Sequence, residues 1–119
     1  MAMREYMACL DAGDRDGALA QMDEGLAFLL GLPNGQVSGS SRADYAKYIA
    51  GRAAPPDRVH DLVRYTRDRD VELAYGVVRE GGRATGAFMS AARLSPDGLI
   101  LRYQSFFDPT FSLVDLEGS

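Results

Sequence analysis

Two long runs rich in aliphatic and aromatic residues, separated by a short turn sequence, constrain this chain more than any other feature. The runs span residues 83–94 and 99–109, and Pro96-Asp97-Gly98 lies between them. Pro96 fixes φ for the first central position of a turn, and Gly98 can adopt a positive φ without steric cost. The pattern therefore predicts a β-hairpin. Strands this long need one face covered, and the segments upstream must supply that cover.

Two helices are expected at the N-terminus. The first covers residues 2–12, where apolar side chains recur at the spacing of one helix face: Met3, Tyr6, Met7 and Leu10. Gly13 can end this helix in a left-handed conformation. Asp14 can then cap a second helix over residues 15–22.

A short hairpin and a third helix follow. Asn34-Gly35 is a strong hairpin signal between an apolar run at residues 26–32 and a short strand at 36–39. One of the serines 40–41 can cap the third helix, which runs to Arg52.

Two further strands, residues 58–67 and 71–80, complete a four-stranded antiparallel meander with the hairpin described first. Gly76 and Gly86 lie inside strands, where glycine marks a bend or a close backbone approach. The predicted fold class is α+β: a cone-shaped arrangement of three N-terminal helices packed on a curved antiparallel β-sheet.

Composition excludes several classes of protein. The 119 residues are expected to form one domain, residues 1–119. The net charge is −4 with both signs interleaved, so a nucleic-acid partner is not expected. Cys9 is the only cysteine, the first five residues lack the apolar core of a signal peptide, and no apolar run approaches the length of a membrane span. These features predict a cytoplasmic protein without a membrane partner.

The acidic cluster Asp11, Asp14 and Asp16 has two interpretations. It is similar to a calcium-binding loop, but the first ligand position would then be Ala12 and the last a short Asp23. Helix capping explains the same residues. No metal and no cofactor is expected, since one histidine and one cysteine do not make an ordinary zinc site.

The chain resembles the nuclear transport factor 2-like superfamily, which includes ketosteroid isomerases and SnoaL-like polyketide cyclases. Four segments carry the resemblance: residues 6–14 followed by Asp16-Gly17, Gly39 before the third helix, residues 96–100, and Phe106-Phe107-Asp108-Pro109. The order of elements agrees over essentially the whole chain. Independently of the resemblance, a curved sheet with helices across its concave side leaves a cone-shaped cavity, and a homodimer is expected.

The resemblance implies catalytic positions only in part. Ketosteroid isomerase uses an aspartate base and an oxyanion hole of one tyrosine and one protonated aspartate. Tyr6 matches the tyrosine, but the base falls at Leu30 or Gly31 and the second acid at Ser90. Asp108 fits a structural ending better than a catalytic role. The known catalytic sets of the superfamily are therefore absent.

Alternation along the last strands predicts which residues face the pocket. The set with side chains suited to an aromatic or polycyclic ligand is Tyr75, Phe88, Ser90, Tyr103, Ser105 and Phe107. Alternation also places Leu73, Val77 and Leu101 on this face.

Two residues are candidate catalytic groups. His60 is the only histidine and is the candidate base, and Tyr6, or else Tyr103, is the candidate donor to an oxyanion. The first hypothesis is a protein that binds a small hydrophobic or carbonyl-bearing molecule, with catalysis unassigned. The alternatives are a polyketide cyclase-, isomerase- or dehydratase-like enzyme and a dimeric protein-interaction module in which C-terminal apolar residues pack on a partner or over the cavity.

Overall fold

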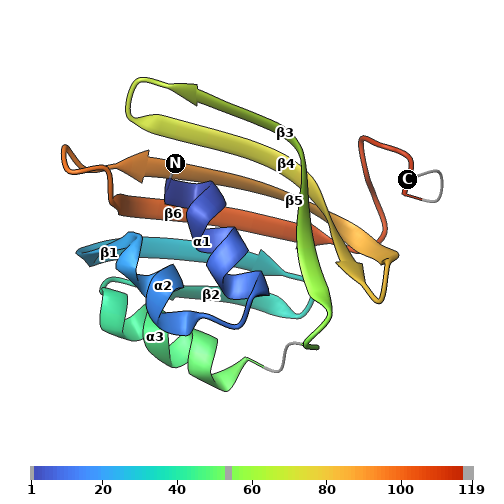
Figure 1. Cartoon of the computed structure of the whole chain (residues 1–119), viewed down its shortest axis with the longest axis horizontal. Coiled ribbons are helices and arrows are strands. Elements are labelled where there is room, and N and C mark those ends of the chain that lie inside the picture. Colours follow the sequence, from blue (N-terminus) through green and yellow to red (C-terminus); the bar gives the residue numbers. More distant parts are fainter. Residues whose placement is uncertain (1, 53–54, 117–119) are drawn as a thin grey trace.

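The computed structural model describes residues 2–52 and 55–116 (Figure 1). Its elements, in chain order, are α1 (Ala2–Asp11), α2 (Arg15–Ala20), β1 (Met22–Leu32), β2 (Gly35–Gly39), α3 (Arg42–Gly51), β3 (Arg58–Asp68), β4 (Val71–Glu80), β5 (Arg83–Leu94) and β6 (Ile100–Asp108). This α+β content confirms the predicted fold class. None of the helices in the described ranges has the length and apolar character that a bilayer crossing requires.

All six strands belong to one sheet in the order β2-β1-β6-β5-β4-β3. The strands from β3 to β6 form the predicted antiparallel meander. The expectation of a purely antiparallel sheet was wrong in one place, because β1 pairs with β6 in the parallel direction. The helix α3 and the strands β2 to β5 lie between these two strands in sequence, and they supply the crossover that a parallel pair needs.

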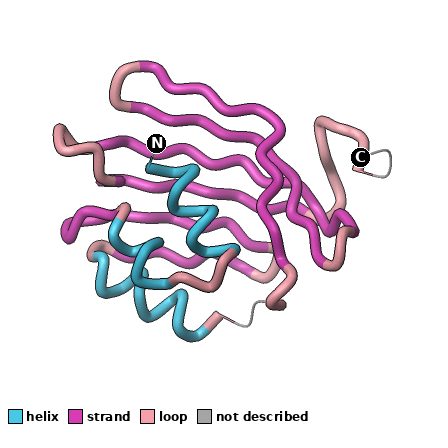
Figure 2. The backbone as a smooth tube through the Cα atoms, viewed as in Figure 1, coloured by secondary structure: helices cyan, strands magenta, loops and turns pink. Residues whose placement is uncertain are grey.

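The three helices lie on one face of the sheet (Figures 1 and 2). We call this face the inner face; the other is the outer face. The largest fully buried side chains include residues from the helices, from β1 and β4, and from the start of β6: Tyr45, Met3, Met22, Leu26, Ile100, Glu72 and Val77.

Local signals placed the helix ends. Gly13 has a φ of 77°, and the Asp14 carboxylate accepts a hydrogen bond from the backbone N–H of Gly17 at 2.9 Å. Ser41 caps α3 by accepting from the N–H of Asp44 at 3.0 Å. The prediction that the second helix reaches Met22 was wrong, because Met22 starts β1, pairs with β6 and is fully buried.

The sheet is bent at irregularities in four strand pairs, of which the β1–β6 pair shifts register between Met22 and Ala27. The register shifts between Leu62 and Arg64 in β3, between Val78 and Arg79 in β4, and between Arg93 and Leu94 in β5. Figure 1 shows β3 turning partway along its length. Such irregularities increase local twist and let a sheet curve around its cover.

A buried carboxylate ties α1 to the sheet. Glu72, on β4, is fully buried, and its two oxygens accept from the N–H of Met3 at 2.9 Å and from the hydroxyl of Tyr65 at 2.5 Å. Met3 is in the first turn of α1, where backbone N–H groups lack partners within the helix and negative charge is favoured. Glu72 therefore fixes the start of the helix against β3 and β4.

Candidate functional site

A cavity of about 650 Å³ lies between α1, α3 and the inner face of the sheet. It is lined mainly by apolar and aromatic side chains, with a few polar groups. The lining residues used below are Tyr6, Tyr45, Tyr48, Arg52, Arg58, His60, Val78, Glu80, Thr85, Phe88, Tyr103, Ser105 and Phe107. A cavity of this size, apolar with a few convergent polar groups, is typical of small-molecule sites.

Two glycines hold the phenylalanines of the lining close to the backbone. A Cβ built on Gly76 would lie 2.5 Å from the ring of Phe88, and one built on Gly86 would lie 2.6 Å from the ring of Phe107. Both contacts are shorter than van der Waals distances, so any larger residue would displace the rings. The sequence prediction that these strand glycines mark close approach is confirmed.

Tyrosines contribute to the polar part of the lining. The hydroxyls of Tyr6 and Tyr45 are hydrogen-bonded to each other, and the rings of Tyr6 and Tyr103 meet edge to face with centroids 5.5 Å apart. The Tyr103 hydroxyl donates to Ser90 Oγ at 3.4 Å, and Ser90 Oγ lies 2.7 Å from Ser105 Oγ. We call Tyr6, Tyr45 and Tyr103 the tyrosine cluster.

The tyrosine cluster remains protonated at neutral pH. Burial raises the pKa of Tyr6 well above its usual range, and the neighbouring Tyr103 raises it further. Burial likewise raises the pKa of Tyr45 and that of Tyr103, although hydrogen bonds to Ser90 and Ser105 offset part of the effect on Tyr103. Neutral phenols are hydrogen-bond donors, which is the form that can stabilise negative charge on a ligand oxygen.

His60, at the start of β3, is held by Asp11 at the end of α1. Its Nδ1 lies 2.6 Å from Asp11 Oδ1, and its backbone N–H donates to Asp11 Oδ2 at 2.8 Å. Both side chains are largely buried, with exposed fractions of 15% and 17%. The ring of His60 also meets Phe88 edge to face at 5.3 Å. When Nδ1 donates to the carboxylate, Nε2 is the nitrogen left to accept a proton.

Charged groups are few around the cavity. Arg58 and Glu80 neutralise each other, with Arg58 Nη2 2.8 Å and Nε 2.9 Å from Glu80 Oε2. Arg52, directly after α3, forms no ion pair within the described part of the chain. Its positive charge acts on the tyrosine cluster, where it opposes the rise in the pKa of Tyr6 and of Tyr103.

The structure brings most of the sequence-predicted residues together. The lining of the cavity includes Tyr6, His60, Phe88, Tyr103, Ser105 and Phe107. Ser90 is buried, and its hydroxyl supports Tyr103 and Ser105 through the hydrogen bonds given above.

The placement of Tyr75 in the pocket was wrong. An unbroken ladder from the Glu80–Arg83 pair would put Tyr75 opposite Phe88, but the register shift at Thr85 puts Gly76 there. One extra residue moves every later side chain of a strand to the other face. Tyr75, Leu73 and Val77 therefore share the outer face, and Thr85 lines the cavity instead. The register shift beside Leu94 likewise puts the side chain of Ile100, and not that of Leu101, on the inner face.

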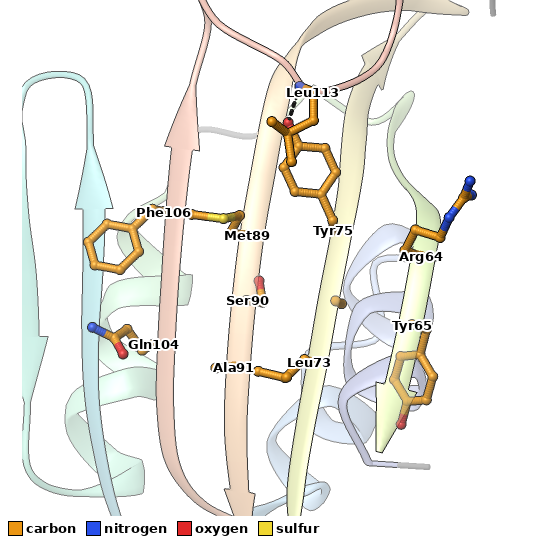
Figure 3. A pocket seen from close by; sticks show the side chains of 11 residues that line it. Arg64, Tyr65, Leu73, Tyr75, Met89, Ser90, Ala91, Gln104, Phe106 and Leu113 are labelled. Atoms are coloured by element: carbon orange, nitrogen blue, oxygen red, sulfur yellow. Dashed lines mark hydrogen bonds between the residues drawn. The ribbon is translucent and has the colours of Figure 1, made fainter. Parts of the chain in front are cut away.

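The outer face carries a second, shallower depression of about 450 Å³ (Figure 3). Leu73, Met89 and Phe106 project from three strands with exposed fractions of 47%, 54% and 37%. The segment after β6 reaches this face, since the N–H of Leu113 donates to the Tyr75 hydroxyl at 2.7 Å. Leu113 thus borders the outer depression, as Figure 3 shows, and does not line the inner cavity.

Four contributors to the site are not apparent from the sequence. In the sequence Asp11 fits a helix cap or a calcium ligand, and nothing in its spacing from His60 signals their contact across 49 positions. Tyr45 and Tyr48 share an apolar helix face with Ile49, which predicts burial but not the cavity. In the sequence Arg52 marks only the end of the third helix.

Comparison with solved structures shows that the fold is that of the nuclear transport factor 2-like proteins. A protein from Kribbella flavida with the provisional name ketosteroid isomerase is similar with a TM-score of 0.72 and 17% identity, covering 96% of this chain and 80% of that one. A nuclear transport factor 2-like protein of unknown function from Cytophaga hutchinsonii has a TM-score of 0.68 and 15% identity, with coverages of 91% and 88%.

A third structure, a provisionally named isomerase of the SnoaL-like family from Agrobacterium tumefaciens, has a TM-score of 0.70 and 17% identity, with coverages of 90% and 94%. No protein-family model matches the chain, and no curated protein matches it. At these identities the likeness concerns the fold and leaves the chemistry to be argued from the cavity itself.

Proposed function

We propose that the inner cavity binds a small hydrophobic molecule bearing a carbonyl group, and that His60 transfers a proton on it. The observation that carries the proposal is the Asp11–His60 pair at a cavity that also contains neutral phenols. A histidine oriented through Nδ1 by a carboxylate is suited to act as a general base through Nε2.

The chemistry follows from where charge develops. Removal of a proton from the carbon beside a carbonyl leaves negative charge on the carbonyl oxygen, and a phenol of Tyr6 or Tyr103 can donate a hydrogen bond to that oxygen. The protonated His60 can return the proton to another carbon, which is an isomerisation. It can instead protonate a leaving hydroxyl, which is a dehydration. The Asp11 carboxylate stabilises the imidazolium in either case.

The fold neighbours support a proton-transfer function only by analogy. Two of them bear provisional isomerase names, from Kribbella flavida and Agrobacterium tumefaciens. This chain has Leu30 and Gly31 where the resemblance places an aspartate base, so a base supplied by His60 from β3 would be a different solution on the same scaffold.

Thermal unfolding against a panel of steroid ketones, aromatic polyketide mimics and simple enones tests binding. A ligand at about 100 times its dissociation constant adds about 2.7 kcal/mol of stability. For a compound that binds, exchange of its α-proton with D₂O solvent, followed by NMR, then tests proton transfer. His60→Gln should abolish exchange and leave binding in place.

Asp11→Asn is the matched variant for the positioning role. It should lower the exchange rate by a factor of 10 to 1,000, because the imidazole loses the carboxylate that orients it and that stabilises its protonated form during the reaction. Exchange that proceeds equally well in His60→Gln would overturn the assignment of the base. Failure of every ligand in the panel would overturn the binding function.

A second candidate function is homodimerisation through the outer face. The exposed side chains of Leu73, Met89 and Phe106 lie together on this face, and contiguous exposed apolar groups mark interaction surfaces. Sedimentation of the wild type, of Met89→Lys and of a chain ending at Pro109 tests it. A dimer that Met89→Lys dissociates supports the surface, and a wild-type monomer at high concentration refutes it.

A further inference from the structure

Arg52 is the one side chain at the inner cavity whose charge no described residue neutralises. The other charged groups are accounted for within the chain: Arg58 pairs with Glu80, and His60 contacts Asp11. The described carboxylates form no ion pair with Arg52. The chain has a net charge of −4, so acidic side chains outnumber basic ones. A partly buried arginine without a carboxylate partner is unusual in such a chain and calls for a physical explanation.

The position of Arg52 is set by the end of α3. Its backbone N–H donates to the carbonyl of Ile49 at 3.2 Å, which ends the helix, and its side chain borders both the inner cavity and a smaller adjoining cavity that Asp11 and Arg15 also line. A cation is favoured at a helix C-terminus by the helix dipole. That effect explains a positive charge at this position but not a guanidinium that lines a cavity.

The field of Arg52 extends to the phenols at the interior of the cavity. Its charge lowers the pKa of Tyr6 and of Tyr103 relative to the effect of burial alone. A negative group placed between Arg52 and these hydroxyls would therefore meet a positive charge together with neutral hydrogen-bond donors. Phe88 and Phe107 in the same lining offer apolar contact.

We infer that the molecule bound in this cavity is an amphipathic carboxylic acid whose carboxylate pairs with Arg52. This inference rests on the proposed binding function and names the class of ligand. The planar fork of a guanidinium matches the two oxygens of a carboxylate. One unpaired cation balances the single charge of a carboxylate, whereas a phosphate dianion would require further donors of positive charge. The apolar lining accommodates a cyclic or aromatic body.

Two ligands of similar size test the charge directly: 2-naphthoate and its neutral analogue 2-acetonaphthone. Isothermal titration calorimetry of the wild type should show naphthoate binding at least tenfold more tightly. Arg52→Gln should weaken naphthoate binding by about tenfold or more, since a charge-assisted pair is lost, and should leave acetonaphthone unchanged. Arg52→Lys, which keeps the charge but loses the fork, should fall between the two.

Arg93→Gln is the matched control, because it changes net charge equally at an exposed position paired with Asp70. It should bind both ligands as the wild type does. The inference is overturned if Arg52→Gln binds naphthoate as tightly as the wild type, or if it weakens both ligands equally. Wild-type binding of acetonaphthone alone would overturn this inference while leaving the proposed function intact. Absence of binding by either ligand would count against both.

Discussion

Replacement of Glu72 by glutamine should destabilise the protein by loosening α1. Glu72 has no exposed surface, and its carboxylate accepts from Met3 and from Tyr65. Glutamine has nearly the same shape but only one acceptor oxygen, so it can satisfy one of these donors and must point its amide at the other.

The magnitude follows from the bonds lost. A hydrogen bond to a charged acceptor contributes about 1.5–3 kcal/mol, and loss of a negative charge at a helix N-terminus costs about 0.3–1 kcal/mol. We therefore expect Glu72→Gln to reduce the free energy of unfolding by about 2–4 kcal/mol. Tyr65→Phe, which removes one donor and leaves the carboxylate bonded to Met3, should cost less, about 1–2 kcal/mol.

Urea unfolding followed by far-UV circular dichroism measures both values; the chain has no tryptophan for a fluorescence probe. The midpoint should fall with an unchanged slope, which indicates lower stability without a change in the surface exposed on unfolding. Hydrogen exchange should speed up first at the amides of α1. A loss below about 0.5 kcal/mol for Glu72→Gln would refute the view that this carboxylate anchors the helix. So would additive losses in the double variant with Tyr65→Phe, because contacting residues should show coupling.

Four substitutions test other parts of the structure. Gly76→Ala should lower the free energy of unfolding, measured by urea denaturation, by about 1–3 kcal/mol, because the new Cβ would lie 2.5 Å from both the ring of Phe88 and the carbonyl of Asp61. Gly51→Ala is the control at a helix position with open space, and it should stabilise the protein by up to about 1 kcal/mol. Gly13→Ala should cost about 1 kcal/mol, since the residue needs a φ of 77°, and a neutral result would contradict the assigned cap. The tyrosine cluster should make the protein less stable at alkaline pH, because the pKa values of its three phenols are raised in the folded protein. The contribution of these phenols to the free energy of unfolding is fully present below pH 10. It is lost as the pH rises above 10, by about 1.4 kcal/mol per pH unit for each group. Stability measured from pH 8 to 11 should fall less steeply in Tyr103→Phe, and an unchanged slope would show that Tyr103 ionises in the folded state.

The cavity also shows how a bent sheet produces a binding site. Gly76 and Gly86 allow the rings of Phe88 and Phe107 to lie against the strands, and the register shift at Thr85 exchanges the faces of β4. A regular ladder would have turned Tyr75 inward and filled part of the space. The depth of the cavity and its polar lining therefore both depend on these backbone features.

Local chemistry in the sequence is enough to predict the helix ends, the turns and the faces of one strand. Gly13, Asp14 and Ser41 mark helix ends because a positive φ or a side-chain acceptor is needed at those positions. Turn residues such as Gly98, whose φ is 82°, placed the hairpins. The alternation along β5 correctly assigned Phe88 and Ser90 to the helix-covered face, since the period of a strand is independent of its partner.

Contacts between residues far apart in the chain set how those elements meet. The parallel pairing of β1 with β6 joins segments far apart in the chain, and no local signal specifies which edge receives β1. The register of β4 depended on one bulged residue, Thr85, which no turn residue marks. The contact of Asp11 with His60, like the position of Arg52 beside the tyrosine cluster, depends on how α1 and α3 cross the sheet. Long-range packing fixes these distances, and a one-residue change in register is enough to alter them.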